Sequence, residues 1–252
     1  MLITEGVFRK PRLRTNVILK RFASLFEGSV VNVSASNDSD KDCSFFEYYF
    51  GDYDSGKRYK EYFTNASSYS ITNYPNDETH LRVDEDETIP LDLEAPLPSD
   101  LEHRFDVVLN HTVLEHVFDI FSAFANLCRM SRDIVIVIVP QFQQIHDYHR
   151  GYADYWRFTP FAMDKLFEAN EMTVLYRETT HGFSESQYLL YIATKHPERW
   201  QDKFPPLPEP REYLNRKIDG STMTSYSAFV VLVDGLIRRV TQRIGRLVRR
   251  DS

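Results

Sequence analysis

One uninterrupted apolar run restricts the fold of this chain more than any other feature. Residues 133–140 read Asp-Ile-Val-Ile-Val-Ile-Val-Pro. Six consecutive β-branched residues favour an extended strand, and a strand without polar alternation has to be covered on both faces. We expect Pro140 to end it, because proline cannot donate to a sheet. Residues 30–33 and 105–109 have the same apolar character, which indicates the interior of a mostly parallel sheet.

Amphipathic segments alternate with these strands. Residues 10–27 carry apolar side chains at helical spacing, so a helix is predicted ahead of the first strand. Residues 113–130 repeat apolar residues in the same way, and Thr159-Pro160 is typical of a helix start. Further strands are predicted at residues 67–75, 89–93, 172–178 and 186–196. The alternation predicts an α/β fold, with a seven-stranded, mostly parallel sheet and helices on both faces.

Composition divides the chain near residue 197. Five prolines fall between residues 197 and 220, which is typical of a linker, so residues 1–196 are predicted to form one domain. Residues 221–252 carry six Arg and two Asp beside an apolar stripe and are predicted to form a basic amphipathic helix. Its partner is either an anionic membrane surface or a protein surface, on its own domain or on a second subunit.

Charge and hydropathy exclude several classes of protein. The formal net charge of −7 argues against a nucleic-acid binder, because neutralising phosphates requires a basic face. The chain has no signal-peptide pattern at its start and no apolar run near the ~18 residues of a membrane span. Cys43 and Cys128 have neither metal-ligand nor redox-pair spacing, so no metal is predicted. We expect a cytoplasmic location, peripheral at the inner face of the membrane if the basic helix binds lipid.

An ordered set of motifs between residues 105 and 159 carries the strongest functional signal. The set comprises Phe105-Asp106, a polar Asn110, Leu114-Glu115-His116-Val117, Arg129, Pro140, His146 and Asp154-Tyr155-Trp156-Arg157-Phe158-Thr159. In order and spacing it resembles class I S-adenosyl-L-methionine (SAM)-dependent methyltransferases of the small-molecule and glycan type. The resemblance covers about residues 28 to 195 and implies a Rossmann-like fold with SAM as the cofactor.

The resemblance also implies cofactor contacts, although the first loop departs from the family's Asp-x-Gly-x-Gly-x-Gly pattern. Its matching positions are Asn32, Ser34, Ser36 and Asp38. Glycine tolerates a positive φ and a close backbone approach, and serine does so only at a cost. After the third strand, Asp92 would accept from the adenine amino group and Leu93 would donate a backbone N–H. The predicted cofactor-binding residues are Asn32, Ser34, Ala35, Ser36, Asn73, Asp92, Leu93 and Asn110.

Two histidines are the predicted catalytic residues. His116 opens the helix after the fourth strand, near the bound methyl group in this architecture, and a neutral imidazole there could take a proton from an attacking hydroxyl. The alternative is that His116 only caps and orients the loop. His146 follows the fifth strand and is predicted to be a base or a substrate contact. In the family, residues matching Asp154 and Arg157 tie down the loop that covers the site.

Two functions follow from these motifs. The first is SAM-dependent O-methylation of a sugar, a glycan or a related small molecule. The second is a catalytically inactive binding or scaffold protein, which the altered loop at residues 34–38 favours. SAM or its demethylated product should bind only in the first case.

Overall fold

The computed structural model describes residues 14–34, 38, 40, 57–75, 88–142, 145, 153–180 and 187–207. The chain divides into two compact units, Met1–Leu207 and Pro208–Ser252. Ala35, Ser36 and His146 lie outside the described residues, as do residues 208–252 with the predicted basic helix and the second half of the predicted linker. The fold described below is that of the first unit.

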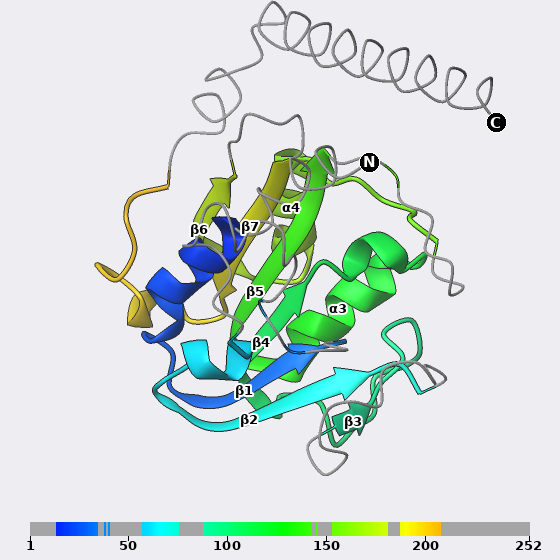
Figure 1. Cartoon of the computed structure of the whole chain (residues 1–252), viewed down its shortest axis with the longest axis horizontal. Coiled ribbons are helices and arrows are strands. Elements are labelled where there is room, and N and C mark those ends of the chain that lie inside the picture. The colour runs from blue at the N-terminus through cyan, green and yellow to red at the C-terminus, as the bar shows by residue number, and fades with distance from the viewer. Residues whose placement is uncertain are drawn as a thin grey trace, which may run out of the picture. The chain divides into compact units, whose positions relative to one another are not determined.

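Seven strands form one sheet in the order β3-β2-β1-β4-β5-β7-β6 (Figure 1). They are β1 Gly28–Val33, β2 Ala66–Asn73, β3 Thr88–Pro90, β4 Phe105–His111, β5 Ser131–Phe142, β6 Thr173–Thr179 and β7 Gln187–Thr194. Neighbours from β3 to β5 pair in parallel, and β7 is antiparallel to both β5 and β6. The predicted seven-stranded, mostly parallel sheet is therefore confirmed. Strand order reverses between β1 and β4, which is where open α/β sheets bind ligands.

The apolar run at residues 133–140 lies in the longest of these strands, β5. Its residues from Ile134 to Val139 are all buried. The prediction that Pro140 ends this strand is wrong, because β5 continues to Phe142. Pro140 lies opposite Tyr188 of β7, and the pairing register shifts between Pro140 and Phe142. A proline is tolerated at such an irregularity because the ladder there does not require its missing N–H.

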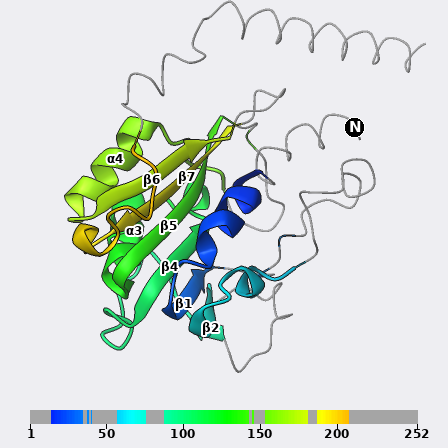
Figure 2. The same ribbon diagram turned by 90° about the vertical axis from the view of Figure 1, so that its left-hand side faces the viewer.

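Helices cover both faces of the sheet, as predicted (Figure 2). Residues 14–23 form a helix ahead of β1, and its buried Leu19 and Phe22 belong to one core cluster with Leu109 of β4. The other face is covered by α3, Ile120–Met130, and α4, Pro160–Ala169. The predicted cap of α4 is confirmed, since the Thr159 hydroxyl accepts a hydrogen bond from the Ala162 N–H.

The single helix predicted over residues 113–130 is wrong. A short 3-10 turn, η3 Leu114–His116, comes first, and α3 begins only after Asp119, whose side chain accepts a hydrogen bond from the Ser122 N–H. This cap starts a new helix with its own phase. Ile120 is consequently buried, while Phe121, which the apolar periodicity placed in the core, is 73% exposed.

The first part of the proline-containing segment packs against the domain. After η4, Pro197–Arg199, the Trp200 ring lies 5.4 Å from that of Phe26, and the Phe204 ring lies 5.1 Å from that of Phe22. Both contacts join residues beyond 196 to the N-terminal helix and the turn that follows it. The compact unit accordingly extends to Leu207.

Candidate active site

Two strained residues mark the carboxyl ends of the central strands. Ser34, directly after β1, has a φ of 58°, and Thr112, directly after β4, has a φ of 54°. Non-glycine residues rarely adopt this left-handed region, and a β-branched residue does so least of all. The Ser34 N–H donates to Thr72 Oγ1 (3.0 Å) and the Thr112 N–H to the Ile138 carbonyl (2.8 Å), so neighbouring strands hold both conformations.

Ser34 thus has the backbone conformation that the family's glycine would supply. Besides Ser34 and Thr112, four non-glycine residues in the described part of the chain have a positive φ, so the conformation alone does not define a site. What distinguishes Ser34 and Thr112 is that they flank the point where strand order reverses.

A buried carboxylate organises the rest of the first loop. Asp38, at the position of the family's last glycine, is fully buried and accepts hydrogen bonds from Asn32 Nδ2 (2.9 Å) and from the Tyr69 hydroxyl. Arg58 Nε lies 3.2 Å from its other oxygen. Burial, followed by the charge of Asp38, raises the pKa of Tyr69 well above its usual value, so the phenol remains a donor. Side-chain bonds therefore hold Asp38 at a position where the family has a glycine.

The loop after β3 is attached to α3. Asn126 Nδ2 donates to the carbonyls of Leu93 (2.9 Å) and Ala95 (2.8 Å). Glu94 Oε1 accepts from the Asp119 N–H (2.7 Å), and Asp92 Oδ1 accepts from the Glu94 N–H (2.9 Å). Asp92 is half-buried and Leu93 is buried. The predicted adenine-binding residues therefore lie in a tightly bonded loop.

Asn73 is the last residue of β2, and Asn110 is the last but one of β4. The Asn73 carbonyl accepts from the Leu91 N–H (2.9 Å), which joins the ends of β2 and β3. Asn110 is fully buried at the end of β4, and its Nδ2 donates to the Val33 carbonyl (3.4 Å). Asn110 Oδ1 has no hydrogen-bond partner among the described residues. An unsatisfied buried acceptor is costly and points to a missing donor.

His116 is oriented by a segment that crosses the same edge of the sheet. Its Nδ1 lies 2.9 Å from the Ala153 carbonyl. A carbonyl can only accept, so Nδ1 carries the proton, and in the neutral imidazole the lone pair lies on Nε2. The ring is half-buried. The contact is compatible with both predicted roles, since it orients the loop and also sets the tautomer that a general base requires.

We call residues 153–158 the strap. The Tyr155 N–H donates to the Glu115 carbonyl (2.7 Å), and the Phe158 N–H donates to the Pro140 carbonyl (3.0 Å). The strap therefore joins η3 to the end of β5. Trp156 Nε1 adds a hydrogen bond to the Val117 carbonyl (2.8 Å).

An ion pair lies within the strap. Arg157 donates to both carboxylate oxygens of Asp154 at 2.5 Å, and the Asp154 side chain is only 1% exposed. The hydrogen bond that Arg157 donates to Asp154 raises the pKa of Arg157 above its usual value. The pair fixes the shape of the segment that holds His116.

The structure brings most of the described predicted site residues to one edge of the sheet. Asn32, Ser34, Asn110 and His116 lie at or just beyond the ends of β1 and β4. Asn73, Asp92 and Leu93 lie at or just beyond the ends of β2 and β3. Arg58 is not among the predicted site residues, because no motif or spacing in the sequence links it to Asp38, 20 positions away.

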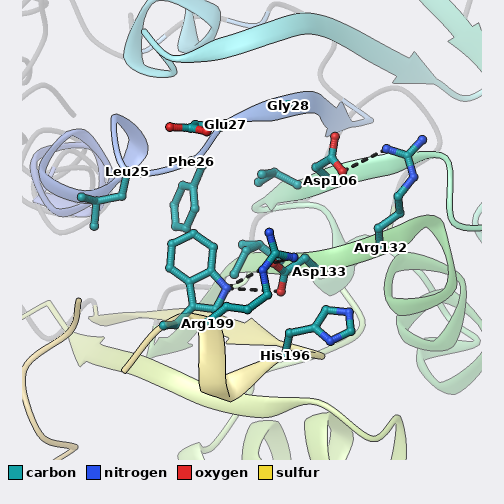
Figure 3. A pocket seen from close by; sticks show the side chains of 12 residues that line it. Leu25, Phe26, Glu27, Gly28, Asp106, Arg132, Asp133, His196 and Arg199 are labelled. Carbon is teal, nitrogen blue, oxygen red and sulfur yellow. Dashed lines mark hydrogen bonds and ion pairs between the residues drawn. The ribbon is translucent and has the colours of Figure 1, made fainter. Parts of the chain in front are cut away.

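A cavity of about 550 Å³ lies at the opposite, amino edge of the sheet (Figure 3). Asp106 accepts from the Ser29 N–H (2.7 Å) and from Arg132 (2.9 Å). Asp133 accepts from Trp200 Nε1 and pairs with Arg199 (3.0 Å). None of the described lining residues has a buried polar side-chain atom without a hydrogen-bond partner. The two aspartates of this cavity are therefore held by partners within the chain.

Comparison with solved structures supports the fold assignment. A chain of the complex between the Haloferax volcanii Trm112 methyltransferase activator and a methyltransferase matches with a TM-score of 0.50 and 11% identity, over 76% of this chain and 92% of that chain. Magnesium protoporphyrin IX methyltransferase from Synechocystis PCC 6803 with bound SAM matches with a TM-score of 0.46 and 12% identity, over 75% and 82%. No protein-family model and no curated protein matches the sequence. The chain has the Rossmann-like fold of class I SAM-dependent methyltransferases.

Proposed function

We propose that this protein is a SAM-dependent methyltransferase. The observation that carries the proposal is Ser34, which holds a glycine-like φ of 58° at the end of β1 although it is a serine. A strained conformation that neighbouring residues maintain at a ligand-binding edge is typical of a functional loop. Ser34 therefore differs from the family pattern in residue type but keeps the glycine-like backbone conformation.

The residues at the carboxyl edge fit the chemical groups of SAM. Asn110 Oδ1 needs a donor, and the cofactor's ammonium group can supply one. We propose that Asp92 accepts from the adenine amino group and that Leu93 donates its backbone N–H. Asn32 and Ser34 are proposed as further cofactor contacts, and Ala35 and Ser36 are proposed on their place in the sequence alone. When bound, SAM supplies an electrophilic methyl group on a positively charged sulfur.

His116 is the proposed general base. Because its Nδ1 donates to the Ala153 carbonyl, its Nε2 can accept the proton of an acceptor hydroxyl. The acceptor we propose is a sugar, a glycan or a related small molecule with a free hydroxyl. His146 is proposed as a second base or an acceptor contact, on the evidence of its place in the sequence alone.

Calorimetry tests the proposal directly. S-adenosylhomocysteine, the demethylated product, should bind the full chain with a sub-millimolar dissociation constant. Transfer of a labelled methyl group from SAM to a panel of sugars and sugar conjugates then tests the acceptor class. Absence of binding to the folded protein would favour the scaffold function and reject the enzyme.

The basic C-terminal segment suggests where the enzyme acts. No helix in the described part of the chain is long and apolar enough to cross a bilayer. We propose that residues 221–252 attach the protein peripherally to an anionic membrane through their six Arg. Vesicles containing anionic lipid should bind the full chain more strongly than a variant with Arg238, Arg239, Arg243 and Arg246 changed to Gln. Equal binding would leave a protein surface as the partner.

A further inference from the structure

A guanidinium group lies beside the point where strand order reverses. Arg58 is held by Asp38, its Nε lying 3.2 Å from Asp38 Oδ2, and Asp38 is bonded in turn to Asn32 near the end of β1. The ring of the next residue, Tyr59, lies 5.2 Å from that of His111, the last residue of β4. These contacts place Arg58 over the adjoining ends of β1 and β4.

Arg58 retains an unused donor. Its Nη2 is buried and has no hydrogen-bond partner among the described residues, although Nε is engaged by Asp38. A buried donor without an acceptor is costly, and more so when it is charged. Guanidinium groups pair best with carboxylates and phosphates, and the contact with Asp38 fixes the direction in which the group points.

Arg58 and Asn110 offer opposite hydrogen-bonding groups. Asn110 Oδ1 is a buried acceptor without a partner at the end of β4, and Arg58 Nη2 is a buried donor without a partner near the end of β1. A ligand that satisfies both carries a donor and an anion. An α-amino acid group, with an ammonium beside a carboxylate, has this composition.

We propose that Arg58 binds the carboxylate of the cofactor's amino-acid part while Asn110 accepts from its ammonium group. The proposal rests on SAM being the cofactor and assigns a residue outside every motif of the sequence. It also explains the side-chain bonds of the first loop, because Asp38 both fixes the loop and orients Arg58.

The experiment compares two ligands that differ only in the amino-acid part. S-adenosylhomocysteine contains it, whereas 5′-methylthioadenosine lacks both the ammonium and the carboxylate. Calorimetry on the full chain should show Arg58→Gln weakening S-adenosylhomocysteine about 10-fold or more. The affinity for 5′-methylthioadenosine should change less than about 2-fold.

Two further variants separate ligand binding from folding. Arg58→Lys keeps a positive charge beside Asp38 but loses the planar fork, so it should show a smaller loss that is again confined to S-adenosylhomocysteine. Lys57→Gln removes a neighbouring exposed charge and should change neither affinity. Equal weakening of both ligands by both Arg58 variants would overturn the proposal and make Arg58 a support of the loop, as would unchanged affinities. Failure of the unmodified chain to bind either ligand would instead reject the proposed function itself.

Discussion

The two edges of the same sheet are built in opposite ways. At the amino edge, Asp106 and Asp133 are each satisfied by several donors, including Arg132 and Arg199. At the carboxyl edge, buried polar atoms of Asn110, Arg58 and Gln141 have no partner among the described residues. The aspartates of the amino edge are held by partners within the chain, whereas the carboxyl edge combines strained backbone with buried polar atoms that have no partner among the described residues. These buried polar atoms favour the carboxyl edge as the candidate site.

The largest expected effect is on the rate of methyl transfer at the carboxyl edge. His116→Gln should slow methyl transfer to a hydroxyl acceptor about 10²-fold or more, because it removes the proposed base. The affinity for S-adenosylhomocysteine should stay within about 2-fold, as the imidazole acts on the acceptor. His196→Gln, a change to an exposed histidine at the amino edge, is the matched control and should leave the rate unchanged. An unaltered rate in His116→Gln would leave this residue with only its orienting role.

The second prediction concerns stability at the amino edge. Gly28 has a φ of +84°, and a Cβ there would lie 2.3 Å from Asp106 Oδ2. Gly28→Ala should lower the free energy of unfolding by about 3 kcal/mol through the clash and the strained φ. Urea denaturation measures the loss.

A second change, at Asp106, separates the cost of the clash from the cost of the positive φ. If it dominates, Gly28→Ala should cost clearly less in an Asp106→Ala background, because that change removes the carboxylate that the new Cβ meets. Equal costs in both backgrounds would show that the positive φ is the larger cause.

A smaller effect is expected at the strained carboxyl edge. Ser34→Gly relieves a positive φ and should raise the free energy of unfolding by about 0.5 kcal/mol. S-adenosylhomocysteine should bind Ser34→Gly at least as tightly as the unmodified chain. Glu171→Gly relieves a similar φ of 57° after α4 and should stabilise without affecting binding. Ligand binding that appeared only in Ser34→Gly would mean that the serine has abolished the site.

The smallest effect concerns pH at the amino edge. Burial opposes ionisation of Asp106, but hydrogen bonds from Ser29 and Arg132 outweigh it and lower the pKa of Asp106 below its ordinary value of 3.8. A lowered folded-state pKa gives stability that is present above the unfolded value and is lost as pH falls through the folded value. The difference in unfolding free energy between the chain and Asp106→Asn should therefore be larger at neutral pH than near pH 3. A constant difference would contradict the assignment.

Some features could be predicted from sequence because local residues determine them. The run ending in Pro140 identifies a buried strand without any knowledge of its neighbours, and Thr159-Pro160 identifies a helix start. The division between η3 and α3 could not be predicted, because the apolar spacing continues across it. The single capping bond of Asp119 decides which residues of α3 face the core. Arg58 could not be found, since its role depends on a contact with Asp38 that only the folded chain creates.

The two tryptophans of the chain make the contrast between the edges visible by spectroscopy. Trp156 lies in the strap beside the turn that carries His116, and Trp200 lines the cavity at the far edge. Intrinsic fluorescence therefore contains one emitter for each edge. With Trp200 changed to Phe, the remaining emission becomes an optical reporter of cofactor titration.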